Sequence, residues 1–347
     1  HKIYLPDGAV FTIEQPMKYY NQDTLEISGR GILKPKKDII MLELANVKNI
    51  SLSNMRIDGS NQNSGAHTSN ALIRMNNVEN VSINRVFLKD GSIGIAASDV
   101  ENYTLSECVG SGFRGWAFTC GGNVRNTTWK NNISYNNEYD GLKMSGQLYN
   151  VTITGNLCFN NGRDGYDFAG HSVDGLRVFD NIFNLNGVEG VEVKTLSRDE
   201  YPVPINVTNP VYLGVEIYNN QLKDNGNFGV AIDNQYSHLM PTRDIFIHNN
   251  KILNDRYQLG QSGMRIANFR LKEKGDMIIH DNIIRDKFDR GIRLLNCDNV
   301  IVRDNDVEAY RVGIELEVQV VGTAENNLIE NNVVESETSN AMRVLAD

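Results

Sequence analysis

The chain has 347 residues, of which 22% are charged, and its formal net charge is -9. This acidic balance argues against a nucleic-acid-binding surface, which is normally basic. The sequence holds no run of about 18 apolar residues that would predict a membrane span. The length suits one elongated domain or two compact ones. Because no Pro/Ser/Gly-rich linker divides the chain, we predict a single domain over residues 1–347.

The first 60 residues consist of short segments that alternate apolar and polar residues, a pattern typical of β-strands. The chain already begins in such a segment, His1 to Tyr4, so we expect a signal peptide, a tag remnant or an N-terminal cap to precede it. We predict that residues 1–60 form the opening coils of a repeat structure and that residues 61–347 form its main coils.

A phrase of roughly 22 to 26 residues recurs through the main coils, and signals for helices are nearly absent. Each copy holds an alternating segment, an asparagine, a few apolar residues, a second asparagine, a polar turn and a glycine. In several copies an asparagine lies nine residues before the glycine. The glycines are Gly94, Gly115, Gly141, Gly165, Gly190, Gly229, Gly263, Gly291 and Gly313, and Ala341 takes this place in the last copy.

A repeat this short cannot bury its own apolar side, so its copies must stack on one another, as they do in solenoids. We predict an all-β fold, a right-handed parallel β-helix of about 11 to 12 coils. Its inner column would include the residue after each glycine, from Trp116 and Leu142 to Ile314. Stacked asparagines would hydrogen-bond from coil to coil. A leucine-rich-repeat solenoid fits less well, since its helical segment is missing.

Four cysteines are present, and none forms a CxxC pair. Cys108 and Cys158 lie two repeats apart, which places their Cα atoms ~10 Å from each other, too far for a disulfide. We therefore predict packed thiols at all four positions, which are Cys108, Cys120, Cys158 and Cys297.

The spacing from each glycine to the next asparagine varies, and the extra residues fall after the strand that follows the glycine. We predict insertions near residues 195–212, 233–244, 254–262 and 267–276. Loops at these places would wall one side of that strand's sheet, and function on a rigid scaffold usually lies beside such loops. The expected result is a groove with one high wall.

On the strand after each glycine, the first residue is expected to point inward and the next outward. Three successive copies place charged residues on this outer face, within ~10 Å along the axis. Carboxylates that close repel one another unless a proton, a cation or a lysine compensates them. The alternative is a solvated face with charges of alternating sign. The predicted cluster comprises Asp140, Lys143, Asp164, Asp167, Glu189, Glu192 and Lys194.

Two arginines follow on the same face. Arg265 and Arg293 would offer bidentate contacts to carboxylate or sulfate groups of an extended anionic ligand. The alternative for both is a surface ion pair, with Asp289 or Glu315 as partners. We also expect Asp233, on the same face, to contact the substrate.

Several aromatic residues are further candidates. Tyr201 and Tyr236, in the predicted insertions, would stack on sugars. His171 follows Asp167 closely and is a candidate catalytic residue, since histidine titrates near neutral pH. His248 and His280 occupy matching positions two residues before an asparagine, and we interpret them as a stack on another face.

Segments of the opening coils resemble the openings of pectin-lyase-like β-helices: Tyr4–Phe11, Leu25–Gly31 and Met55–Gly59. The resemblance covers nearly the whole chain and implies the fold rather than one reaction. Polysaccharide lyases, polygalacturonase-type hydrolases, alginate C5-epimerases and phage tailspikes share this type of fold. The Asp-Pro-His-Glu active-site sequence of the epimerases is absent here, which weighs against epimerisation by their mechanism.

The central repeats resemble two groups of lyases. One calcium-dependent pectate lyase group carries Asp-Asp-Gly-x-Asp with a lysine base in the following coil. Here Arg163 stands in place of the first acid, Asp164 and Asp167 match the other two, and Lys194 follows in the next coil. Chondroitinase and alginate-lyase β-helices carry an acid five residues before the catalytic lysine, as Glu189 stands to Lys194.

Polygalacturonase-type hydrolases carry acidic motifs, then Gly-His-Gly, then Arg-Ile-Lys in successive coils. Asp164, Asp167, Glu189 and Arg265 fall in suitable coils of this chain. The histidine of that pattern is missing, and Ala267 takes the place of its lysine.

We hypothesise a secreted, extracellular or periplasmic polysaccharide lyase that cleaves an acidic, uronate-containing polysaccharide by β-elimination. Ca²⁺ or an arginine would neutralise the uronate carboxylate, and a lysine would remove the acidified C5 proton. The expected metal ligands are Asp140, Asp164, Asp167 and Glu189. The expected catalytic residues are Lys194, Lys143, Asp167, Glu192 and His171.

Two other functions stay open. A polygalacturonase-like hydrolase would use two acids among Asp164, Asp167, Glu189 and Glu192. A tailspike-like adhesin would bind a glycan without cleaving it and would be a trimer, whereas we expect an enzyme to be monomeric. The expected partner is an acidic polysaccharide, with no nucleic acid and no membrane.

Overall fold

The computed structural model describes the chain except for residues 61, 63–69, 196–209, 235–239, 319–323 and 347. It divides into two compact units, His1–Tyr166 (unit 1) and Asp167–Asp347 (unit 2), which we describe separately. The prediction of a single domain stays a prediction. None of the described residues forms a helix of the length and apolarity that crossing a membrane requires.

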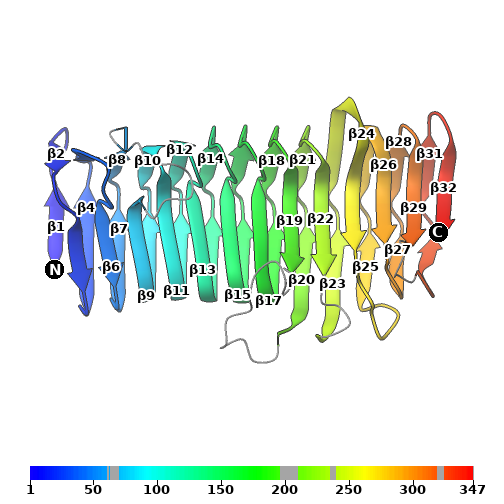
Figure 1. The fold of residues 1–347 in the computed structure, drawn as a ribbon, viewed down its shortest axis with the longest axis horizontal. Helices are drawn as coiled ribbons and strands as arrows, with labels where there is room; N and C mark the ends of the chain where they lie inside the picture. Colours follow the sequence, from blue (N-terminus) through cyan, green and yellow to red (C-terminus); the bar gives the residue numbers. More distant parts are fainter. Residues whose placement is uncertain (61, 63–69, 196–209, 235–239, 319–323, 347) are drawn as a thin grey trace. The chain divides into compact units, whose positions relative to one another are not determined.

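Unit 1 is built from parallel β-strands that follow one another along the chain (Figure 1). The strands are β1 (Lys2–Leu5), β2 (Val10–Ile13), β3 (Met17–Tyr20), β4 (Thr24–Gly29), β5 (Ile32–Pro35), β6 (Leu42–Ala45), β7 (Asn49–Ser53), β8 (Arg56–Asp58), β9 (Ala71–Asn84), β10 (Phe87–Gly91), β11 (Ile93–Ser106), β12 (Val109–Phe113), β13 (Phe118–Lys130), β14 (Ile133–Tyr135), β15 (Leu142–Thr154) and β16 (Leu157–Phe159).

Unit 2 repeats the same arrangement, and its first strand begins one residue before the unit does. The strands are β17 (Tyr166–Phe179), β18 (Ile182–Asn184), β19 (Glu189–Thr195), β20 (Tyr212–Tyr218), β21 (Gln221–Lys223), β22 (Phe228–Asn234), β23 (Thr242–His248), β24 (Lys251–Ala267), β25 (Met277–His280), β26 (Ile283–Leu295), β27 (Val300–Arg303), β28 (Asp306–Ala309), β29 (Val312–Val318), β30 (Leu328–Glu330), β31 (Val333–Ser336) and β32 (Asn340–Ala346).

Each strand pairs in parallel with the equivalent strand of the next coil, so each unit has three stacked sheets, as a parallel β-helix requires. The sheet that follows the marker glycines, called sheet 1 below, carries the predicted charged face. In unit 1 it contains β3, β6, β9, β11, β13 and β15, and in unit 2 it contains β17, β19, β22, β24, β26, β29 and β32. This number of strands is close to the about 11 to 12 coils expected.

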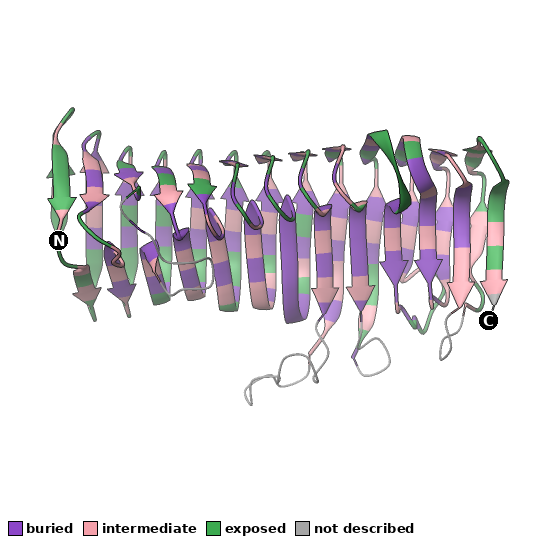
Figure 2. Cartoon of the chain, turned by 45° about the horizontal axis from the view of Figure 1, so that its top comes forward, coloured by how far each residue is buried: buried purple, intermediate pink, exposed green. Residues whose placement is uncertain are grey.

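Side chains of sheet 1 alternate between the core and the outer face, as predicted (Figure 2). In β19, Val191 and Val193 are fully buried, and Glu192 between them is only partly buried. In β15, Leu142 and Met144 are likewise core residues on either side of Lys143. Because the register is parallel, an outward residue of one coil lies beside an outward residue of the next.

The predicted asparagine ladders are present within each unit. In unit 2, Asn250 donates through Nδ2 to Asn282 Oδ1 at 3.0 Å, and its own Oδ1 accepts from Asn220 Nδ2 at 2.9 Å. The same side chain accepts from the Asn220 backbone N–H and donates to the Ile217 carbonyl. One asparagine per coil therefore satisfies the buried backbone groups of its turn. The members are Asn181, Asn220, Asn250, Asn282, Asn305 and Asn332.

The predicted packed thiols are confirmed, because all four cysteines are free and buried. Burial raises the pKa of the Cys108 and Cys297 thiols to about 12, so they stay protonated. The predicted histidine stack is also present: the His248 and His280 rings lie 4.9 Å apart and nearly parallel, next to Tyr218.

Two sequence predictions are wrong: one concerns a predicted loop, and the other concerns a predicted core residue. Residues 254–262 are not a loop but part of β24, which stays paired with β26 and absorbs the extra residues as register shifts (Figure 1). Trp116 is not a core residue. Phe118, not Trp116, pairs with Leu142, so Gly115 lies two residues ahead of the position that matches Gly141.

The other predicted insertions lie between strands, and their role as groove loops stays a prediction. Residues 268–276 connect β24 to β25. At the predicted insertion 195–212, β19 ends at Thr195 and β20 begins at Tyr212. At the predicted insertion 233–244, β22 ends at Asn234 and β23 begins at Thr242. Residues 196–209 and 235–239, which include Tyr201 and Tyr236, lie outside the described residues.

We expect Asn250→Ala to lower the free energy of unfolding by about 2–4 kcal/mol, because it leaves several buried backbone and amide groups without partners. Urea unfolding followed by circular dichroism measures this change. The matched control is Asn102→Gly, in an exposed ladder where Asn102 has a φ of 55° that glycine also tolerates. Equal losses in the two variants would contradict the importance of the buried ladder.

Candidate functional site

Unit 2 gathers three carboxylates on the outer face of β17 and β19. Asp167, on β17, is 1% exposed, and Glu189, at the start of β19, is 6% exposed. Carboxylate oxygens of Glu189 and Glu192 lie within 4.8 Å of each other. Three buried or half-buried acids this close cannot all stay ionised without compensation. The solvated, alternating surface that we considered as an alternative does not describe this face.

The surroundings of Glu192 change its proton affinity. Burial first, and then the negative charges of Asp167 and Glu189, raise the pKa of Glu192 to about 7. Lys194 opposes the shift, because its ammonium group contacts the Glu192 carboxylate and favours the ionised form. Glu192 therefore holds a proton for part of the time at neutral pH, whereas an ordinary glutamic acid is ionised there.

The next coil extends this face with an ion pair. Asp233, on β22, is in register with Lys194, and Arg265, on β24, lies 3.4 Å from the Asp233 carboxylate. The amide of Asn268 donates to Asp233 at 2.8 Å. Burial raises the pKa of Asp233, and both of these contacts act in the opposite direction. Arg265 and Asp233 thus lie on the predicted face as a pair, and sequence analysis did not anticipate Asn268.

Arg293, on β26, forms ion pairs with carboxylates of the protein, as the alternative prediction of a surface ion pair proposed. Its Nε donates to Glu317 at 2.9 Å and lies 3.5 Å from Glu315. Glu315 is completely buried and also contacts Arg290 and Arg343. A buried carboxylate surrounded by guanidinium groups is a structural network, because loss of one partner would leave a buried charge uncompensated.

His171, further along β17, is buried, and its Nδ1 has no hydrogen-bond partner among the described residues. Burial lowers the pKa of His171, since it disfavours the imidazolium form. The ring is therefore neutral at physiological pH. Its role in catalysis remains a prediction.

Unit 1 contributes its own acidic pair. Asp140 and Asp164 are 1% and 0% exposed. Asp140 accepts a hydrogen bond from the Trp116 indole at 2.8 Å and another from the Asp164 backbone N–H at 3.1 Å. Trp116 is thus a partner of a predicted site residue. Alternation along the sequence could not have shown this, because Trp116 has the same spacing as the core residues Phe118 and Cys120.

Lys143 lies in sheet 1 of unit 1 on the outer face, in register with Thr119. The four expected Ca²⁺ ligands are divided between the units: unit 1 supplies Asp140 and Asp164, and unit 2 supplies Asp167 and Glu189. Carboxylate oxygens are the hard ligands that Ca²⁺ prefers. Calcium binding remains a prediction.

Comparison with known proteins agrees with the fold. A family model described as "Right handed beta helix region" matches residues 205–345. No curated protein matches the chain in sequence. The catalytic domain of a GH87 α-1,3-glucanase variant in complex with tetrasaccharides, for which no organism is named, is similar, with a TM-score of 0.59 and 13% identity over 99% of this chain and 63% of that one.

A second similar structure is the catalytic unit of the GH87 α-1,3-glucanase from Streptomyces thermodiastaticus, with a TM-score of 0.54 and 14% identity over 100% of this chain and 62% of that one. The chain thus spans less than two thirds of either glucanase. At such identities the likeness concerns the fold alone. The chain has a right-handed parallel β-helix fold, as its repeats predict.

We expect protonation of Glu192 to appear as a pH dependence of stability. Between pH ~4.5 and ~7 the folded state holds a proton that the unfolded state has released, so the free energy of unfolding falls as pH rises through this window. Glu192→Gln should remove this decrease, as urea midpoints measured across the window would show. The exposed control Glu337→Gln should keep it. An unchanged slope in Glu192→Gln would contradict the assignment.

Proposed function

We propose that the chain is a carbohydrate-active enzyme that hydrolyses glycosidic bonds with carboxylates of unit 2. The observation that carries this proposal is the raised pKa of Glu192 beside Asp167 and Glu189. Glycoside hydrolysis needs one protonated and one ionised carboxyl group across the scissile bond. Acids whose pKa values are pushed apart by their surroundings supply such a pair. The similar glucanase structures support a carbohydrate substrate, at the level of fold.

In this proposal Glu192 is the general acid and Asp167 is the ionised partner. Glu192 donates its proton to the leaving glycosidic oxygen as the bond to the anomeric carbon breaks. The Asp167 carboxylate either activates water or attacks the anomeric carbon itself. Water supplies the oxygen and the proton that complete the products. Glu189, beside Glu192, helps to keep the acid protonated by charge repulsion.

Lys194 has a positioning role in this scheme. Its ammonium group contacts Glu192, and the neighbouring coil brings Asp233 into register with it. Acids on two sides favour the charged ammonium form, which cannot accept a proton. Lys194 would therefore orient and tune Glu192. This surrounding disfavours Lys194 as the base of a β-elimination.

β-Elimination of a uronate polysaccharide is the second candidate. Two observations favour it. Each unit has buried carboxylates that could be ligands for Ca²⁺, and Lys143 and Lys194 are candidate bases. In that case the metal would supply charge neutralisation of the substrate carboxylate. The substrate would be an acidic polysaccharide, and the enzyme would act outside the cell, where such polymers occur.

Product analysis separates these candidates. The protein is incubated with neutral α-1,3-glucan and with acidic polysaccharides, with and without a chelator. We expect new reducing ends without the ultraviolet absorbance of an unsaturated uronate, and no effect of the chelator. Unsaturated products lost on chelation would instead establish the lyase. Glycan binding without any cleavage would overturn both and support the adhesin.

Replacement of the two proposed catalytic acids tests their roles. We expect Glu192→Gln and Asp167→Asn each to lower kcat/KM by about 10²–10⁴-fold, since each removes proton transfer or the ionised partner. Lys194→Met should shift the alkaline limb of the pH–rate profile to higher pH, because this limb reports loss of the Glu192 proton and the substitution removes the charge that lowers the pKa of Glu192. Glu337→Gln should have full activity. Full activity of Glu192→Gln would sink the proposed mechanism.

A further inference from the structure

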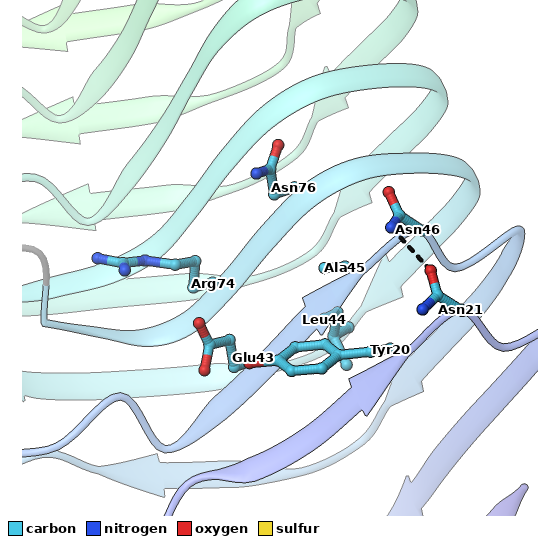
Figure 3. A pocket seen from close by; sticks show the side chains of 8 residues that line it. All are labelled: Tyr20, Asn21, Glu43, Leu44, Ala45, Asn46, Arg74 and Asn76. Atoms are coloured by element: carbon cyan, nitrogen blue, oxygen red, sulfur yellow. Dashed lines mark hydrogen bonds between the residues drawn. The ribbon is translucent and has the colours of Figure 1, made fainter.

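We propose that unit 1 carries a separate glycan-binding site, in the hollow over β3, β6 and β9, that takes a carboxylate-bearing sugar residue through Arg74. The proposal rests on the proposed carbohydrate substrate and narrows its class to an acidic polymer. None of the candidate catalytic residues belongs to this hollow. Figure 3 shows the residues that line the hollow, and the register of sheet 1 places them on adjacent strands.

The hollow has a volume of about 340 Å³ and is open to solvent (Figure 3). Adjacent strands bring its side chains together, because β3 pairs with β6 and β6 with β9. One row consists of Lys18, Glu43 and Arg74, and the neighbouring position holds Tyr20, Ala45 and Asn76. The full lining is Tyr20, Asn21, Glu43, Leu44, Ala45, Asn46, Arg74 and Asn76.

Arg74 differs from the arginines of the candidate active site. It is half-buried, yet it makes no ion pair with any residue that the structure describes. Glu43, its neighbour in register, is instead paired with Lys18 at 3.6 Å. Arg265 and Arg293 are both occupied by carboxylates of the protein. A guanidinium fork without a protein carboxylate is suited to a carboxylate of a ligand.

The other walls suit a sugar ring. Tyr20 is 40% exposed, and its ring lies beside Glu43 (Figure 3). A tyrosine ring offers an apolar face and a polar edge, as a sugar does. On the far side, Asn46 donates to Asn21 and accepts from Asn77, at 2.8 Å in each case. These hydrogen bonds fix the amides before a ligand arrives, which reduces the entropy that binding costs.

Beyond the hollow, small side chains follow Arg74 on the next strands of sheet 1. Arg74 is followed in register by Ala96 on β11, Thr119 on β13 and Lys143 on β15. Two small residues thus separate two cationic residues, over a distance of about 14 Å for three strand spacings. A strip of this kind accommodates an extended chain whose negative charges recur, rather than a single sugar. This favours an acidic polysaccharide over a neutral glucan.

The test measures binding in a full-length Glu192→Gln background, so that cleavage does not interfere. Calorimetry uses hexagalacturonate, hexamannuronate and a hyaluronan hexasaccharide as acidic probes, and nigerohexaose as the neutral probe. We expect at least one acidic probe to bind, with Kd raised at least about tenfold by Arg74→Ala, less by Arg74→Lys, and not by Arg56→Ala, an exposed arginine of the same unit. Hydrogen exchange should show protection of β3, β6 and β9.

Equal affinity of Arg74→Ala for every acidic probe that binds, or protection elsewhere only, would overturn the site, as would equally tight binding of nigerohexaose. Failure of all four probes to bind would also overturn it. These outcomes are separate from those of the proposed reaction. Acidic binding that depends on Arg74, without any cleavage by the unmodified protein, would support this site and contradict the hydrolase.

Discussion

Parallel backbone pairing from coil to coil is the constraint on which the other features depend. It places equivalent residues of successive coils about 4.8 Å apart, one strand spacing, whatever their chemistry. Residues that benefit from this stacking form ladders, such as Asn220, Asn250 and Asn282, which satisfy the backbone of each turn. Rings stack in the same way at Tyr218, His248 and His280.

The same spacing is unfavourable for like charges, and this gives the outer face of sheet 1 its chemical character. Where Glu192 lies near Asp167 and Glu189, burial and then charge repulsion raise the pKa of Glu192 to about 7. Where carboxylates meet arginines instead, as Glu315 does with Arg293, the charges are neutralised within the protein. The same face therefore contains acids that repel one another and acids that are paired with arginines.

The repeat allowed the fold to be predicted, because glycine and asparagine spacing reports the coil length directly. Burial of the cysteines and alternation along β19 followed from the same register. Local shifts in strand register could not be predicted from the repeat. Gly115 suggested a core position for Trp116, but the strand begins at Phe118 and frees the indole to bind Asp140. The ion pair between Arg265 and Asp233 needed side-chain geometry that periodicity does not contain.

The central claim is that the acids of unit 2 add water across a glycosidic bond, with Glu192 as proton donor. Mass spectrometry of products formed in oxygen-18-labelled water tests this most directly. Hydrolysis predicts one labelled oxygen at each new reducing end, and Glu192→Gln should abolish these products. Unlabelled fragments that carry a double bond at the new non-reducing end would contradict the claim, because elimination breaks the bond between the glycosidic oxygen and C4 of the uronate and adds no water.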